Sequence, residues 1–280
     1  MADPPYLVKP PCDNRTAVVA CTPHTGLGTV LYGRVAVNLA TCKTGPASAT
    51  QPKSGPRVVG GTIVFHGKAV VRVAHKGDSV WLDGTTPDGK WIFYAFDRFA
   101  SASLAADGLP VRAIRASGGR SYPIATGLVY ASYRSWCDGR LVMTAGFDRD
   151  TTTNKWLVTA SPPTWKAHVL VKSARRVFGS LTCARDGLIV QGTSASDEGF
   201  RSPHWSLWHV DWNGELRRLT TPPKGVSDES PQYVGGVLYF VRSGSLYALR
   251  AARLLGPLLR VPRAAPGFFG HTDWAYSVRR

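Results

Sequence analysis

The sequence predicts an all-β fold built from a repeated four-stranded unit. Tight-turn dipeptides recur at nearly constant steps, and a short apolar strand follows each of them. Sustained helical periodicity is almost absent between residues 62 and 261. The 29 glycines and 20 prolines in 280 residues suit a chain in which many turns separate short strands.

The turns themselves mark the repeat. Their first residues are 50, 48 and 49 positions apart, in the pairs Asp88-Gly89, Asp138-Gly139, Asp186-Gly187 and Gly235-Gly236. Such dipeptides favour the positive φ angles of a tight hairpin turn. Four turns at this spacing indicate an internal repeat rather than coincidence.

Each period supplies four strands. The strand after each turn is an apolar run, at residues 91–94, 141–143, 188–190 and 237–240. The third strand is clearest in "WSLWHVDWNG", where polar and apolar residues alternate with period two. The fourth strand is expected in the segments "PVRAIRAS", "HVLVKSA", "ELRRLT" and "GPLLRVP".

Four strands in every 40–50 residues or so are typical of a β-propeller blade. Complete units are expected at about 77–125, 126–175, 176–221 and 227–262. We therefore predict about six blades, closed by N-terminal strands that pair with the C-terminal unit, because closure removes exposed sheet edges. The whole chain, 1–280, is predicted to form one domain. Residues 1–56 form an irregular, cysteine-containing entry segment with a Pro/Ser-rich loop at 43–56, and the regular blades follow from about 57 to 280.

Two segments resemble the TolB-like, or WD40-like, propeller repeat. "TPDGKWIFYAF" is similar to the core of that repeat, and "LWHVDWNGELRRLTTPPKGVSDESPQYVGG" is similar to its second half. The resemblance covers about residues 77 to 262. The sequence departs from the repeat's Pro-Asp-Gly in the later turns, where Cys137, Arg185 and Gly235 replace a proline or an aspartate. The resemblance implies the propeller fold and hardly anything about function.

The five cysteines are Cys12, Cys21, Cys42, Cys137 and Cys183. None forms a C-x-x-C pair, so neither a zinc site nor a redox motif is predicted. Two of the first three are expected to form a disulfide. Cys137 and Cys183 fall on adjacent innermost strands, where a disulfide would join neighbouring blades. The odd count leaves one thiol unpaired.

These cysteines favour an extracytoplasmic location, secreted or in the periplasm or cell envelope, with the leader absent from this sequence. A cytoplasmic location is the alternative. No apolar stretch reaches the roughly 18 residues of a membrane span, so no transmembrane segment is expected. The protein is expected to be a monomer.

The charge is strongly basic: 34 Lys and Arg against 18 Asp and Glu give a net charge of +16. Such a balance suits an anionic polymer as partner, or reflects an arginine-rich proteome. The charges are scattered and never form a run of five. Arginines at 112, 115, 217, 218, 260 and 263 are expected on outermost strands, around the rim, which predicts only weak, salt-sensitive polyanion binding.

Motifs for catalysis or cofactor binding are not found, and no cofactor or metal is predicted. "GLGTVLYG" and "GGTIVFHGKA" lack the spacing of phosphate-binding loops, and no G-x-S-x-G elbow occurs. "FDRDTTTN" places Asp148, Asp150, Thr152 and Asn154 at alternate positions, as a calcium loop does. It lacks the glycine and the closing glutamate of such a loop, so a polar turn is predicted.

The candidate binding residues lie on the innermost strands, just before the turns. They are Trp81, Asp83, Arg134, Trp136, Gln232 and Tyr233. A mixed aromatic and polar ring at a channel suits a protein, peptide or glycan ligand. We therefore predict non-catalytic binding at the channel mouth. The alternative is a propeller enzyme of the lactonase, sugar dehydrogenase or hydrolase type, which needs several carboxylates or histidines converging on the channel.

Overall fold

The computed structural model describes residues 21–32, 35–47, 55–73, 75, 77–97, 108–128, 130–148, 150–195, 204–261, 263, 274 and 276–280. Cys12 lies outside the described residues. Within them the chain forms β-strands and one short 3-10 helix, η2 (Ala131–Tyr133). The predicted all-β class is confirmed.

Four consecutive sheets follow the chain, each with four antiparallel strands in sequence order. The first holds β7 (Ser79–Thr85), β8 (Trp91–Asp97), β9 (Leu109–Arg115) and β10 (Ser121–Gly127). The second holds β11 (Arg134–Cys137), β12 (Arg140–Ala145), β13 (Trp156–Ala160) and β14 (His168–Val171). The third holds β15 (Arg176–Cys183), β16 (Gly187–Ser194), β17 (Ser206–Asp211) and β18 (Leu216–Arg218). The fourth holds β19 (Asp228–Val234), β20 (Val237–Arg242), β21 (Ser245–Arg250) and β22 (Arg253–Arg260).

Two further sheets come from the ends of the described chain. One has three strands, β4 (Arg57–Val59), β5 (Thr62–Phe65) and β6 (Lys68–Arg72). The other, the terminal sheet, joins β1 (Thr29–Tyr32), β2 (Val35–Asn38) and β3 (Thr44–Pro46) to the C-terminal β23 (Ser277–Arg279). In it β23 pairs antiparallel with β1, so that Val30 lies opposite Val278. The predicted pairing of N-terminal strands with the C-terminal unit is found here.

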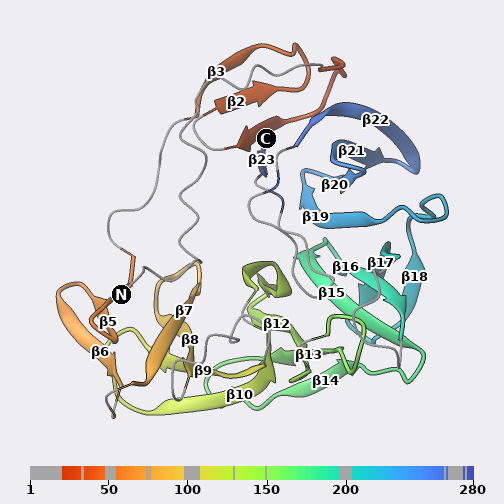
Figure 1. Cartoon of the computed structure of the whole chain (residues 1–280). Helices are drawn as coiled ribbons and strands as arrows, with labels where there is room; N and C mark the ends of the chain where they lie inside the picture. Colours follow the sequence, from red (N-terminus) through yellow and green to blue (C-terminus); the bar gives the residue numbers. More distant parts are fainter. Residues whose placement is uncertain are drawn as a thin grey trace.

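The six sheets are arranged around a shared centre (Figure 1). The first strand of each four-stranded repeat lies toward the centre, and β10, β14, β18 and β22 lie toward the outside. This radial arrangement of antiparallel sheets is that of a β-propeller.

One strand assignment from the sequence was wrong. The segment "PVRAIRAS" forms β9, the third strand of its sheet, and the outer strand is β10. The segment of β10 was not recognised as a strand because it contains Pro123 and Gly127, which are weak strand formers. An edge strand tolerates both residues. Arg112 and Arg115 therefore do not lie on an outermost strand.

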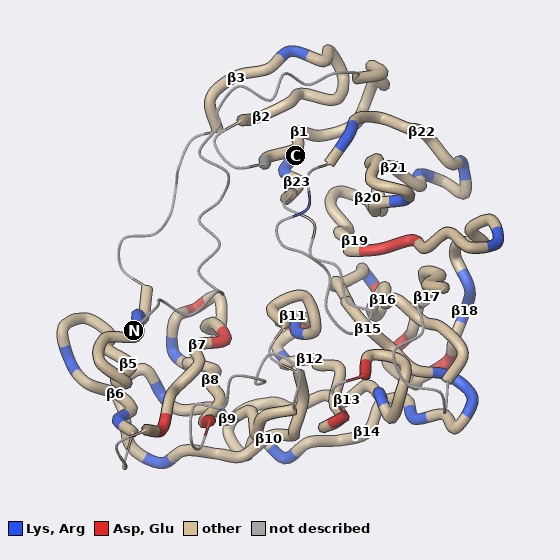
Figure 2. Tube along the Cα trace, in the orientation of Figure 1, with Lys and Arg blue, Asp and Glu red and all other residues tan. Residues whose placement is uncertain are grey.

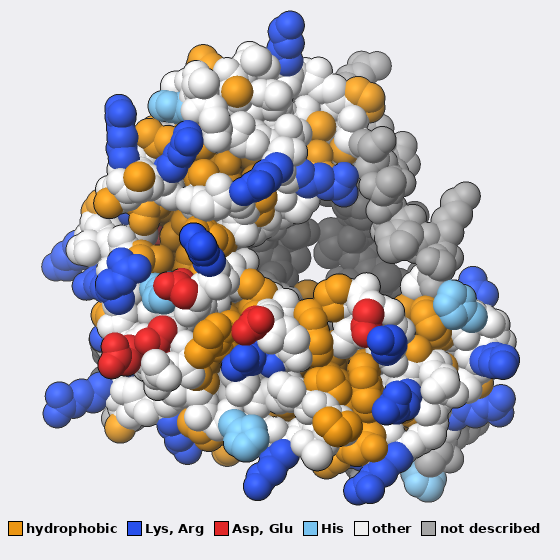
Figure 3. All heavy atoms as spheres, turned by 180° about the vertical axis from the view of Figure 1, so that it is seen from behind, with side chains coloured by type: hydrophobic (Ala, Val, Ile, Leu, Met, Phe, Trp, Pro, Cys, Tyr) orange, Lys and Arg blue, Asp and Glu red, His pale blue; other side chains and the backbone are white. Residues whose placement is uncertain are grey.

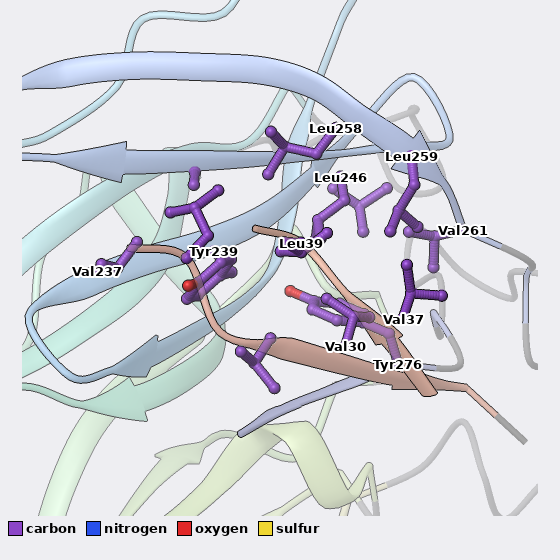
Figure 4. Packing of buried hydrophobic residues seen from close by; sticks show 14 residues of the cluster. Val30, Val37, Leu39, Val237, Tyr239, Leu246, Leu258, Leu259, Val261 and Tyr276 are labelled. Carbon is purple, nitrogen blue, oxygen red and sulfur yellow. The ribbon is translucent and has the colours of Figure 1, made fainter. Parts of the chain in front are cut away.

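The apolar core is distributed between neighbouring sheets. Between the β7–β10 and β11–β14 sheets, Trp165 is fully buried and its ring lies 5.0 Å from Trp91 and 5.3 Å from Phe93. At the other end of the chain, Val30 and Tyr276 meet Tyr239 and Leu246 of the β19–β22 sheet (Figure 4). Large side chains thus fill the wedge between adjacent blades, as face-to-face packing of sheets requires.

Two disulfides join segments as the sequence predicts. Cys21 is bonded to Cys42 in the region of the terminal sheet. Cys137, at the end of β11, is bonded to Cys183, at the end of β15, so this bond joins the innermost strands of neighbouring sheets. None of the helical structure among the described residues has the length and apolar character needed to cross a lipid bilayer.

The disulfide between blades gives the first prediction. Its cysteines are 46 residues apart, and a closed loop of that length restricts the unfolded chain by about 4 kcal/mol. Replacing Cys137 and Cys183 together by alanine is expected to lower the free energy of unfolding in urea by about 2–4 kcal/mol. Added reductant should weaken the wild type much more than this variant. Equal stability of the two proteins under oxidising conditions would contradict the expectation.

Candidate functional site

The innermost strand β7 presents different residues to its two sides. Val80 and Leu82 pack into the apolar cluster that the β4–β6 and β7–β10 sheets share. Trp81 lies between them in sequence, so its indole points to the opposite side. It is 41% exposed.

Asp83 and Arg134 form a buried ion pair between β7 and β11. Nη1 of Arg134 donates a hydrogen bond to Oδ1 of Asp83, and Nη2 donates to the carbonyl of Leu128 at 2.7 Å. The two side chains are only 4% and 5% exposed. Burial raises the pKa of Asp83 while the Arg134 charge opposes this rise, and burial lowers the pKa of Arg134. The structure thus brings two predicted channel residues together as a contact between neighbouring blades.

Trp136 and Tyr233 also serve contacts between sheets. The Trp136 ring lies 6.1 Å from both Phe93 and Trp165, within the packing between the β7–β10 and β11–β14 sheets. Tyr233 is half-buried against the cluster between the β15–β18 and β19–β22 sheets, and its backbone N–H donates to Thr182 Oγ1 at 3.4 Å. Both rings are therefore shared with a neighbouring blade.

Gln232 holds the C-terminal segment against β19. Its Nε2 donates to the carbonyl of Tyr276 at 2.8 Å, and its Oε1 accepts from the N–H of Val278 at 2.9 Å. The side-chain amide thereby pairs with the backbone as a neighbouring strand would. All six candidate residues lie on innermost strands or at their ends as predicted, and their binding role stays a prediction.

Trp81 differs from the other eight tryptophans, and all nine fall within the described ranges. Trp165 and Trp205 are buried in the core. Five rings carry a cation over their face: Trp91 under Arg115, Trp156 under Lys172, Trp208 under Arg176, Trp212 under Arg140 and Trp274 under Arg263. Such stacking covers the apolar ring face. Trp81 has no cation or ring partner among the described residues, so its indole is a free aromatic surface.

The basic residues are distributed over all the sheets. Figure 2 shows Lys and Arg along the whole circumference, and Figure 3 shows them spread over the opposite face, among apolar and other side chains. Arg217 and Arg218 on β18, and Arg260 on β22, lie on outermost strands as predicted. A continuous basic face is not formed in these views.

The loop between β12 and β13 contains a feature that sequence reasoning missed. Its polar run is organised by Lys155, whose ammonium donates to the carbonyls of Asp148, Asp150 and Thr153 at 2.7, 2.8 and 2.8 Å. An ammonium thus occupies the centre that a metal ion would take in a calcium loop. Burial lowers the pKa of Lys155 to about 8, and the two aspartates act in the opposite direction. Within the described part of the chain, no three His, Cys, Asp or Glu residues come together as metal ligands would.

No protein-family model matches the chain, and no curated protein matches it in sequence. Solved structures that match over most of it include a puromycin hydrolase, at 16% identity and a TM-score of 0.49 over 86% of this chain. A puromycin-hydrolyzing peptidase from Mycobacterium tuberculosis matches at 15% identity and a TM-score of 0.46 over 91%. A proposed 6-phosphogluconolactonase from Bacteroides fragilis matches at 13% identity and a TM-score of 0.37 over 90%.

This chain spans 45% and 44% of the length of the first two proteins and 68% of the third. Similarity at this level does not transfer an activity, and the TolB-like resemblance of the sequence stays a prediction.

The Asp83–Arg134 pair gives the second prediction. Replacing Asp83 by Asn leaves the Arg134 charge buried without a counter-ion, which should lower the free energy of unfolding by about 3–5 kcal/mol. Asp138, in an exposed pair with Arg140, is the matched control, and Asp138→Asn should cost less than about 1 kcal/mol. Urea unfolding measures both. A loss for Asp83→Asn as small as that of the control would show that the pair is not a structural contact.

The Lys155 loop gives the third prediction. Lys155→Met removes the donor that three carbonyls share, and we expect a loss of about 3 kcal/mol in the free energy of unfolding. Lys166→Met, an exposed change near the same sheet, should leave stability nearly unchanged. Thermal unfolding of the two variants decides the matter, and equal midpoints would refute the role given to Lys155.

Proposed function

We propose that this chain is a non-catalytic binding propeller that takes a protein or peptide segment at the channel mouth beside Trp81. The observation that carries the proposal is the free indole of Trp81 on the innermost strand β7. Exposed tryptophans supply large contact areas at low entropic cost, and they are enriched among residues that dominate binding energy.

A peptide is favoured over a glycan because the polar candidate residues Asp83 and Gln232 are already hydrogen-bonded within the protein. A sugar needs several side chains free to bond its hydroxyls. Asp83 is paired with Arg134, and both functional groups of Gln232 bond the C-terminal backbone. What remains is chiefly an apolar ring, which suits an aliphatic or aromatic side chain of a polypeptide.

The same contacts bear on the enzyme alternative. A lactonase, sugar dehydrogenase or hydrolase needs carboxylates or histidines that reach a substrate in the channel. The Asp83 carboxylate is instead buried against a guanidinium. This engagement supports the binding role.

The proposal extends to the closure and the location of the protein. We propose that the ring closes between the terminal sheet and the β4–β6 sheet, since closure would protect the sheet edges of both. Two disulfides support an oxidising, extracytoplasmic environment. Scattered arginines, several of them stacked on aromatic rings, support at most weak binding of polyanions.

The fourth prediction tests the binding role. A displayed library of random peptides is selected on the full chain, and the enriched sequence is made as a labelled synthetic peptide. Fluorescence anisotropy should show that Trp81→Ala weakens its binding by roughly thirtyfold, because loss of an anchoring tryptophan costs about 2 kcal/mol or more.

Phe147→Ala is the control, since Phe147 is 63% exposed and lies outside the strands that line the centre. It should change the affinity by less than about twofold. Selection that enriches no peptide, or a peptide that binds Trp81→Ala as well as the wild type, would reject the proposed function.

A further inference from the structure

A separate cavity lies between the terminal sheet and the β19–β22 sheet. Its volume is about 280 Å³, and three chain segments line it: the residues before β1, the turn between β19 and β20 with the start of β20, and the end of β23. Val234, Val237 and Leu27 supply its apolar wall. The cavity is away from Trp81, which is on β7.

Arg279 and Arg280 line this cavity and Arg250 lies beside it; Arg250 and Arg280 each pack closely against a glycine. A Cβ atom at position 26 would be 2.4 Å from Nη1 of Arg250, and one at position 235 would be 2.4 Å from Nε of Arg280. Both glycines also have positive φ angles, +82° and +63°. Glycine at these positions therefore provides the space that the guanidinium groups occupy.

These arginines have no acidic side chain as a partner within the described part of the chain. Arg279 and Arg280 line the cavity, and Arg250 is close enough to Tyr239 to act electrostatically on its hydroxyl. No aspartate or glutamate is among the lining residues. Among the residues the structure describes, none forms an ion pair with Arg250, Arg279 or Arg280.

Tyr239 adds a neutral donor. Its ring is 2% exposed, and its hydroxyl oxygen accepts a hydrogen bond from the N–H of Gly28 at 3.0 Å. The hydroxyl proton remains available, and no acceptor for it occurs in the described part of the chain. Burial raises the pKa of Tyr239, so the phenol stays protonated at neutral pH. Figure 4 shows its oxygen beside the segment that leads into β1.

We propose that this cavity binds a small oxyanion, a phosphate or carboxylate group carried by a small molecule. Guanidinium groups form charge-assisted and often bidentate hydrogen bonds with both kinds of group. The Tyr239 hydroxyl donates a further hydrogen bond, and the valine and leucine wall contacts an apolar part of the ligand. A cavity near the lower size limit of ligand pockets admits a small molecule and excludes a polymer.

Because of the position of the cavity, a bound ligand is expected to stabilise the fold. The lining residues come from both ends of the described chain and from the β19–β20 turn, next to the β1–β23 pairing. A ligand that contacts all three segments binds the folded chain and not the unfolded one. Its binding therefore raises the stability of the fold by mass action.

The test uses the full chain with inorganic phosphate and, separately, with acetate, at constant ionic strength set by chloride. Calorimetric titration should show saturable binding at one site, and thermal unfolding should shift upward with the same anion. Tighter binding of phosphate assigns the site to phosphate esters, and tighter binding of acetate assigns it to carboxylates.

Matched variants separate this site from general salt effects. Arg250→Gln combined with Arg280→Gln should weaken binding by at least about tenfold, and Tyr239→Phe by about fivefold. The control is Arg217→Gln combined with Arg253→Gln, which removes two exposed charges from outer strands and should leave the affinity unchanged.

General stabilisation by phosphate acts on every variant alike, so it does not reproduce this pattern. If neither anion binds saturably at millimolar concentration, or if the control variant loses as much affinity as the Arg250/Arg280 variant, the proposal is overturned. The peptide-binding experiment at Trp81 is independent of either result.

Discussion

Each blade of this protein must bury both faces of its sheet against its neighbours, and most other features follow from that constraint. The second strand of each central sheet shows it best, since β8, β12, β16 and β20 are buried along nearly their whole length. A strand buried on both sides cannot alternate between polar and apolar residues. It is therefore a continuous apolar run, such as residues 237–240.

The same constraint separates what the sequence could predict from what it could not. A tight turn such as Asp138-Gly139 and the apolar strand after it depend on local sequence preferences. The regular spacing of such turns therefore predicted the blades. Equivalent positions in adjacent repeats lie side by side, which is why the Cys137–Cys183 bond was predictable. The direction of inner-strand side chains depends on the neighbouring sheet. Trp136 and Gln232 were therefore placed on the correct strands, but their contacts with other blades could not be foreseen.

Part of the arginine excess serves the structure, and this cannot be seen from the composition alone. Planar guanidinium groups cover tryptophan faces on several blades, the closest being Arg176 at 3.6 Å from the Trp208 ring centre. Others form ion pairs, such as the bidentate contact of Arg242 with Asp228. These arginines are already engaged, which weakens the inference from net charge to a polyanionic partner. Arg280 stands apart because it lines a cavity that has no aspartate or glutamate in its wall, and Arg250 lies beside the same cavity, against Gly26.

The junction of the two chain ends is the place where a propeller is most easily opened, because a single strand pair connects distant parts of the sequence. Here side chains of β19 reinforce that pair. Gln232 bonds the backbone around β23, and Glu229 accepts a hydrogen bond from Trp274 Nε1 at 2.6 Å. The arginine-lined cavity adjoins this junction, whereas Trp81 lies on β7, in the β7–β10 sheet. A ligand in the cavity would thus act on the stability of the β1–β23 junction, while a ligand at Trp81 would use the fold only as a rigid support.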